Sequence, residues 1–173
     1  MATETRTRIG RFRVGRNGWI AGAVGGFVGS VLFGLMMPAA TITTAIPAMY
    51  GIEGPAMTAG WLLHIFHGVV LGLAYVALVQ VGPLADIATR LGGSLGLGVA
   101  YGVVTTALLP VLVMPVWLAA VGFAMAPPFP NLAVPGTLET LVGHVVYAIP
   151  VALAYALAAR NAQSDRTTSE STA

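Results

Sequence analysis

The feature that most constrains this chain is a set of four apolar segments, each long enough to cross a bilayer as a helix. They cover residues 19–39, 58–81, 94–116 and 138–159. A crossing needs about 20 apolar residues, so a chain of 173 residues holds four crossings and short connections. Charged residues make up only 8% of the chain, too few to cover a water-soluble surface. The sequence therefore predicts an all-α, polytopic membrane protein whose main partner is the lipid bilayer.

The basic residues predict how the chain is oriented. Five precede the first segment, one lies between the second and third, and two follow the fourth: Arg6, Arg8, Arg11, Arg13, Arg16, Arg90, Arg160 and Arg166. Arginine collects on the cytoplasmic side of membrane proteins. We expect a multi-pass protein of the plasma membrane with both termini cytoplasmic and the loops 40–57 and 117–137 outside. An arginine-rich start before an apolar run is also typical of a cleavable secretory signal.

The second half of the chain resembles the first. An offset of 80 residues aligns the second segment with the fourth, and an offset of 77 aligns the first with the third. The matched pairs include His64 with His144, His67 with Tyr147, Tyr75 with Tyr155, Gly25 with Gly102, and Met37 with Met114. This pattern predicts two repeated helical hairpins, about 18–81 and 94–160, related by a pseudo-twofold axis along the membrane normal.

Small residues four positions apart recur in every segment and predict close helix packing. The clearest series are Gly22, Gly26 and Ser30 in the first segment and Ser94, Gly98 and Gly102 in the third. Such small-xxx-small ridges let helix backbones approach one another in lipid. We expect a tight four-helix domain over 18–160 that forms a homo-oligomer or joins a larger membrane complex. The basic tail 1–17 and a disordered polar tail 161–173 flank it.

Two histidines hold matched places near the outer ends of their segments. His64 and His144 each begin a helical stripe that carries a small residue one turn deeper. A tyrosine lies about three turns deeper on each stripe, Tyr75 and Tyr155, where we expect it to anchor the inner interface. If the hairpins are repeats, the two imidazoles lie at equal depth and face each other. The candidate cofactor-binding residues are therefore His64, His144, His67, Met37 and Met114.

These side chains suit three kinds of bound group. Two imidazoles, or one imidazole and a methionine, can supply the axial ligands of a haem. Imidazole with thioether sulfur also suits copper(I), and a quinone or proton site is the third option. The competing interpretation gives the histidines no ligand, because an imidazole near the headgroups can hydrogen-bond to water or to the helix backbone.

Signatures of catalysis are missing from the sequence. The chain has no cysteine and no lysine, which excludes thiolate metal sites and a lysine-bearing phosphate loop. Neither a nucleophile elbow nor a paired-histidine zinc motif occurs. We therefore expect a non-enzymatic binding or accessory module that does not bind nucleic acid. The alternatives are a small transport or channel subunit with its pore on the pseudo-twofold axis, and a purely structural partner of a larger complex.

The segment "HIFHGVVLGLAY", residues 64–75, carries a family resemblance. With its two histidines and following glycines, the chain resembles a set of uncharacterised four-helix integral membrane proteins of haloarchaea. The resemblance covers the second to fourth segments and implies the same four-helix fold. Members of this set sometimes carry a sensor-kinase label. This sequence does not support that label, because 173 residues leave no room for an ATP-binding kinase domain.

Overall fold

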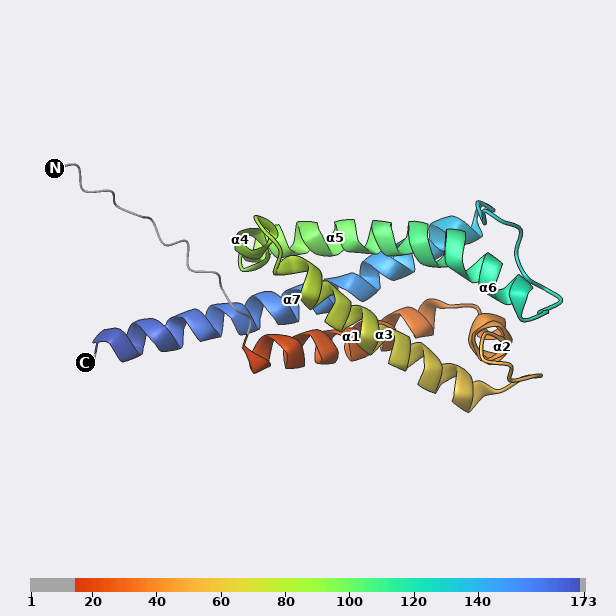
Figure 1. Cartoon of the computed structure of the whole chain (residues 1–173), viewed down its shortest axis with the longest axis horizontal. Helices are drawn as coiled ribbons and strands as arrows, with labels where there is room; N and C mark the ends of the chain where they lie inside the picture. The colour runs from red at the N-terminus through yellow and green to blue at the C-terminus, as the bar shows by residue number, and fades with distance from the viewer. Residues whose placement is uncertain (1–14, 172–173) are drawn as a thin grey trace.

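The computed structural model describes the backbone of residues 15–171, and the side chains as far as Ala162 together with Ser164. Within this range the regular structure is entirely helical (Figure 1). The long helices are α1 (Arg16–Met36), α3 (Met57–Val79), α5 (Leu91–Leu108) and α7 (Gly136–Ser171). A π-helical turn, η2 (Leu109–Val113), and α6 (Met114–Ala120) extend α5. The short elements are η1 (Thr41–Ala45), α2 (Ile46–Ala48) and α4 (Leu84–Ala88).

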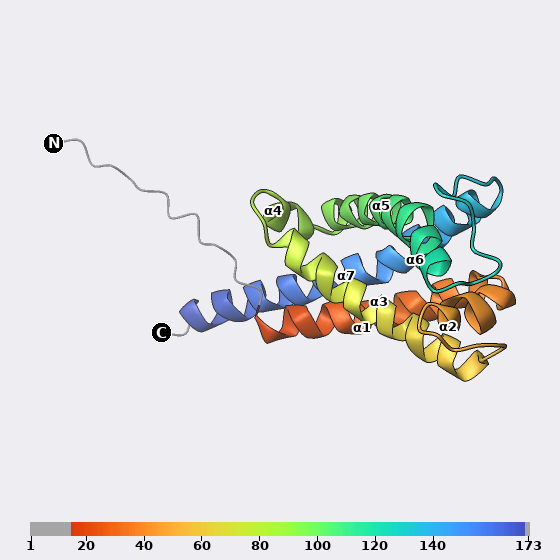
Figure 2. The same cartoon turned by 45° about the vertical axis from the view of Figure 1, so that its right-hand side comes forward.

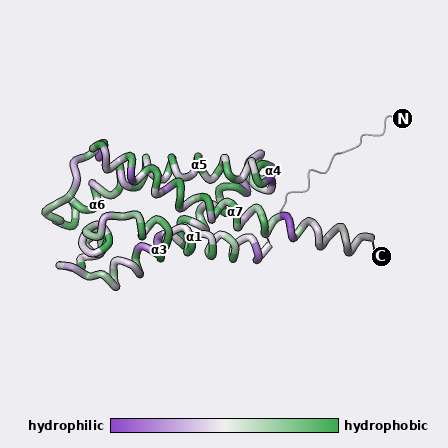
Figure 3. The backbone as a smooth tube through the Cα atoms, turned by 180° about the vertical axis from the view of Figure 1, so that it is seen from behind, coloured by the Kyte–Doolittle hydropathy of each residue, from purple (hydrophilic) through white to green (hydrophobic). Residues whose placement is uncertain are grey.

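Four helices are long and apolar enough to cross a membrane. They cover Arg16–Met36, Met57–Val79, Leu91–Ala120 and Gly136–Ala162. The predicted all-α fold with four membrane-length helices is confirmed, and the architecture is compatible with a multi-pass membrane protein. Hydrophobic residues follow these helices along their length (Figure 3). Large apolar side chains such as Leu35 and Leu62 remain exposed on the outside, as helices that face lipid require.

Among the four long helices, α1 and α7 pack against each other at the centre, with α3 beside α1 and α5 beside α7. The most extensive contacts join α1 to α7, α1 to α3, and α5 to α7, while α3 and α7 share a smaller contact. Figures 1 and 2 show α3 crossing over the central pair and α5 running on its other side. The loops bearing η1, α2 and α6 lie at one end of the molecule, here called the loop end. The other end, where α1 begins and α4 lies, is the start end.

Glycines allow the helix backbones to meet directly. A methyl group built on Gly25 of α1 would lie 2.6 Å from the Cα of Val151 on α7. One built on Gly102 of α5 would lie 2.7 Å from the Cα of Val145, also on α7. Gly26 meets the carbonyl of Gly68 where α1 crosses α3. These distances leave no room for a side chain, so the predicted close packing of small residues is confirmed at all three interfaces.

The end of the chain differs from its prediction. The polar tail 161–173 was expected to be disordered, whereas α7 continues as helix to Ser171. No glycine or proline follows Pro150, so nothing in the sequence stops the helix where its apolar stretch ends. The basic tail, including Arg6, Arg8, Arg11 and Arg13, lies outside the described residues.

Candidate functional site

Two buried histidines from different helices lie against the same phenylalanine toward the loop end. His64 of α3 and His144 of α7 are each only 7% exposed. The ring of Phe33 on α1 contacts both, with its centroid 5.7 Å from that of His64 and 4.7 Å from that of His144. The two imidazoles were expected to lie at equal depth and to face each other, and the structure brings both against one ring. Phe33 of α1 thus contacts one histidine on each of two neighbouring helices, α3 and α7.

Neighbouring glycines make room for this group, which we call the Phe33 cluster (Phe33, His64 and His144). A methyl group on Gly143 of α7 would run into the Phe33 ring. One on Gly34 of α1 would lie 3.1 Å from Cδ2 of His64 and would also collide with the Trp61 indole. The rings of Phe33 and His64 therefore fill space that a glycine on the facing helix leaves open.

Hydrogen bonds fix the orientation of both imidazoles. His64 donates from Nε2 to the backbone carbonyl oxygen of Ser30 across the α1–α3 interface, at 2.9 Å. His144 donates from Nδ1 to the carbonyl oxygen of Thr140, one turn earlier on α7, at 2.9 Å. A carbonyl oxygen only accepts, so these bonds require a proton on the bonded nitrogen. A neutral ring then keeps a free lone pair on the other nitrogen, Nδ1 of His64 and Nε2 of His144.

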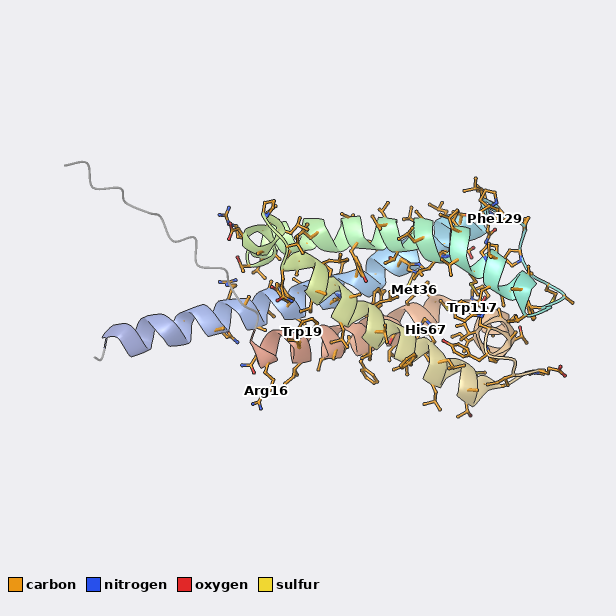
Figure 4. The ribbon with its side chains drawn as sticks, in the orientation of Figure 1. Arg16, Trp19, Met36, His67, Trp117 and Phe129 are labelled. Carbon is orange, nitrogen blue, oxygen red and sulfur yellow. The ribbon has the colours of Figure 1, made fainter. Side chains whose placement is uncertain are left out.

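His67 lies in a different environment from the matched pair. Its Nε2 is hydrogen-bonded to the hydroxyl of Tyr50, which belongs to the loop between α2 and α3, and the two rings stack. Tyr50 also touches Trp117 of α6, whose indole nitrogen donates to the carbonyl oxygen of Met49 at 2.8 Å. Figure 4 shows His67 and Trp117 toward the loop end. His67 thus holds the Tyr50 loop against α3 instead of joining the Phe33 cluster, and Trp117 joins the same loop to α6.

The methionine candidates separate in the same way. Met37, directly after α1, is partly buried and packs on the core that includes Phe33 and Tyr147. Met114 is half-buried at the start of α6. Met36 is 50% exposed and is labelled in Figure 4. Among the described residues, His, Asp and Glu side chains do not gather in groups of three that could hold a metal ion. Any metal at the Phe33 cluster would therefore need thioether or other ligands beside the imidazoles.

Tyr75 and Tyr155 do meet, but not at an interface with solvent or headgroups. Both are only 1% exposed, and their ring centroids lie 6.2 Å apart in an edge-on arrangement. Both side chains thus pack inside the bundle, and their expected role as anchors of the inner interface stays a prediction. Each sits on the buried stripe of its helix, below the histidine, and that stripe faces the neighbouring helices along its whole length.

Sequence reasoning missed Phe33 and the backbone acceptors of Ser30 and Thr140. A lone phenylalanine in an apolar helix carries no signal of its own, and backbone carbonyls carry none at all. The available hint was Gly143, directly before His144, because the missing side chain there leaves room for a ring from a facing helix. Comparisons with protein families, curated proteins and solved structures give no match to this chain.

Proposed function

We propose that this chain is a non-enzymatic ligand-binding module of the membrane, with its ligand held by His64 and His144 at the Phe33 cluster. One observation carries the proposal: two buried imidazoles from separate helices converge on one ring, and each is held by a carbonyl oxygen through a single nitrogen. Burying an imidazole is costly unless its polar atoms have partners. The remaining lone pairs are the places where a ligand would satisfy both rings.

The hydrogen bonds resemble those of histidines that bind metals. A histidine that ligates a metal nearly always donates its other ring N–H to a carbonyl, a carboxylate or water, which fixes its tautomer and its direction. His64 and His144 both have such a bond, at 2.9 Å each. A buried histidine without a ligand needs a partner for its N–H as well. The bonds therefore meet what a metal ligand requires, and the copper analysis below separates the two readings.

Copper(I) is the best-supported ligand class for this site. It accepts two or three soft or imidazole ligands and needs no thiolate, and the chain has no cysteine. Met37, which packs on the same core, offers a thioether. A haem or a quinone would need a flat space between the imidazoles, and the Phe33 ring lies against both. Those larger groups need more space beside Phe33 than a single ion does.

The way the helices cross also supports the repeated hairpins. In the first hairpin Gly26 meets Gly68, and in the second Gly98 lies 3.3 Å, measured from a built methyl group, from the carbonyl oxygen of Ala148. Ala148 follows Gly68 by 80 residues, the offset that matches the histidines. These contacts make Gly98 the counterpart of Gly26, at an offset of 72 residues, whereas the alignment of Met37 with Met114 has an offset of 77. At the offset of 72, the counterpart of Ser30, which accepts from His64, is Gly102 beside His144.

The same crossings favour a binding module over a channel subunit. Backbone meets backbone at glycine between α1 and α3 and between α1 and α7. A hydrophilic pore needs a lined space between helices, and these contacts fill the middle of the subunit.

Both termini are proposed to lie in the cytoplasm of a plasma membrane protein, with the Phe33 cluster in the outer half. A homo-oligomer or a larger membrane complex is the proposed setting.

Metal analysis of the purified protein tests this proposal. The chain is purified in detergent, loaded with copper(I) under reducing conditions, and titrated against a chromophoric copper(I) chelator. We expect one copper per chain, and we expect His64→Ala and His144→Ala each to abolish binding. His67→Ala is the matched control, because its ring bonds to Tyr50 instead. Stoichiometric copper that survives the His64→Ala/His144→Ala double change, or no stoichiometric copper in the parent, would overturn the proposal.

A further inference from the structure

Two tyrosine hydroxyls inside the helix bundle have no partner. The hydroxyl oxygens of Tyr75 and Tyr155 are buried, and neither forms a hydrogen bond with any described residue. Their side chains are among the most buried large ones in the structure. An isolated hydroxyl is costly in an apolar interior, and more so within a bilayer where water does not reach it. Two such groups on facing side chains call for a shared explanation.

Other buried tyrosines of this bundle show how the fold ordinarily satisfies a phenol. Tyr101 of α5 donates to the carbonyl oxygen of Leu71 on α3 at 2.8 Å. Tyr147 of α7 donates to the carbonyl oxygen of Gly68 on α3 at 2.7 Å. Each of these phenols crosses a helix interface to reach a backbone acceptor. Tyr75 of α3 and Tyr155 of α7 reach no such acceptor, so their hydroxyls need a partner of another kind.

A third buried hydroxyl group, that of Ser94, lies beside Tyr75. The Tyr75 ring lies edge-on to both Tyr155 and Tyr101, with centroids 6.2 and 5.3 Å away. Its hydroxyl lies beside Ser94 without forming a hydrogen bond of normal geometry. Ser94 donates its own proton to the carbonyl oxygen of Ala152 at 2.7 Å. The serine oxygen therefore keeps lone pairs that can accept from a third molecule.

We propose that Tyr75 and Tyr155 bind an internal water molecule, with Ser94 as a third ligand. A buried water needs two to four polar partners, and this group provides two phenols and one serine oxygen. The water would accept from both phenols and donate to the serine oxygen, so that both buried hydroxyls have a partner. A cavity of about 300 Å³ lies at the start end and is lined by Tyr155, Arg16 and Asn17.

The test compares phenylalanine variants of Tyr75, Tyr155 and Tyr101 by thermal unfolding in detergent. Removing a hydroxyl that holds the water is expected to lower the Tm by about 2 to 4 °C in Tyr75→Phe and in Tyr155→Phe. The double variant is expected to lose no more than the larger single loss, because both hydroxyls hold the same water. Tyr101→Phe combined with Tyr75→Phe is the additive control, since Tyr101 has its own backbone acceptor.

Two results would overturn this inference. An unchanged or higher Tm in Tyr75→Phe or Tyr155→Phe would mean that the lost hydroxyl was an unpartnered group with no ligand. A high-resolution experimental structure in which the two phenols bond directly, without water density between them, would replace the water by a phenol–phenol bond. Density for a water within hydrogen-bond distance of both hydroxyls, lost in the double variant, is the expected observation.

Discussion

The phenol of Tyr147 on α7 donates a hydrogen bond to the carbonyl oxygen of Gly68 on α3, at 2.7 Å. Gly68 has no side chain at this position because α1 presses on the same turn: a methyl group there would collide with Ser30. The absence of a side chain also exposes its carbonyl to Tyr147. One glycine thus serves two interfaces, a backbone contact with α1 and a polar contact with α7.

Loss of this bond should weaken the bundle measurably. Tyr147→Phe keeps the ring, removes its hydroxyl and leaves the Gly68 carbonyl oxygen without this donor in an apolar interior. We expect a loss of about 1 kcal/mol in the free energy of unfolding. Reversible denaturation in detergent, followed by circular dichroism, measures it. A variant as stable as the parent would mean that water or lipid satisfies the carbonyl equally well.

The glycines of α5 provide a graded test of packing within one helix. Gly102→Ala would place a methyl group 2.7 Å from the Cα of Val145, so α5 and α7 must separate. Gly98→Ala is milder, because the methyl would lie 3.0 Å from the Cβ of Ala152. Gly96 has nothing within 4 Å, and Gly96→Ala is the matched control.

The expected order of stability follows from those distances. Overpacking at Gly102 should cost about 1–3 kcal/mol. Gly98→Ala should cost less, and Gly96→Ala should be neutral or stabilising by up to about 1 kcal/mol, because alanine favours the helix over glycine. Denaturation of the three variants under one condition measures the order. Equal stability of all three would show that α5 and α7 do not pack through their small residues.

The sequence predicted the four crossings well because length and hydropathy are properties of the chain alone. The predicted span 58–81 and the observed α3, Met57–Val79, nearly coincide. Interfaces of small residues were predictable for the same reason, since glycine spacing of four sets a face of the helix. What the sequence did not contain is which helix meets which face. In the fold α1 packs against both α3 and α7, and this arrangement brings Phe33 of α1 against both histidines.

The fate of His67 illustrates the same limit. Its spacing from His64 allowed both to serve one ligand, yet its ring turns toward Tyr50 in the loop before α3. The loop's path depends on the π-helical turn η1 and on Ile42, whose carbonyl presses on Gly60. Such turns have no distinct sequence signature. Residues on the helices were therefore more predictable than contacts made by the loops.

The proposed orientation of the chain in the membrane rests on its arginines and is open to a direct test. A reporter fused after Ala173 and one inserted after the exposed Gly82 should both report cytoplasm. A reporter inserted at Glu53 should report the outside, since no basic residue occurs in that loop. Reporters active only on one side of the membrane make the measurement. An external C-terminus would place the Phe33 cluster in the inner half instead.

The loop contacts around Tyr50 should protect that loop from proteolysis. Trp117 donates to the carbonyl oxygen of Met49 at 2.8 Å and touches Tyr50. Trp117→Phe keeps an aromatic ring but loses the donor. Chymotrypsin should then cleave after Tyr50 up to about fivefold faster, as expected for the loss of a bond of about 1 kcal/mol. Mass spectrometry of the fragments measures the rate.

A matched control exists at the start end. Trp19 on α1 is 39% exposed, and Trp19→Phe should leave cleavage after Tyr50 unchanged. Equal rates in Trp117→Phe and the parent would show that the indole does not hold the loop. The comparison also bears on His67, because its partner Tyr50 is held between His67 and Trp117.

Two adjacent methionines can identify the ligands of the proposed copper site. Met37 packs on the core that contains Phe33, whereas Met36 is 50% exposed. Leucine keeps nearly the same volume and removes only the thioether, so the fold should persist in both variants. If sulfur completes the site, Met37→Leu should weaken copper(I) binding by at least about tenfold, and Met36→Leu should not. Chelator competition measures both affinities. Unchanged affinity in Met37→Leu, with binding still lost in His64→Ala, would leave the two imidazoles as the ligands and exclude the Met37 thioether.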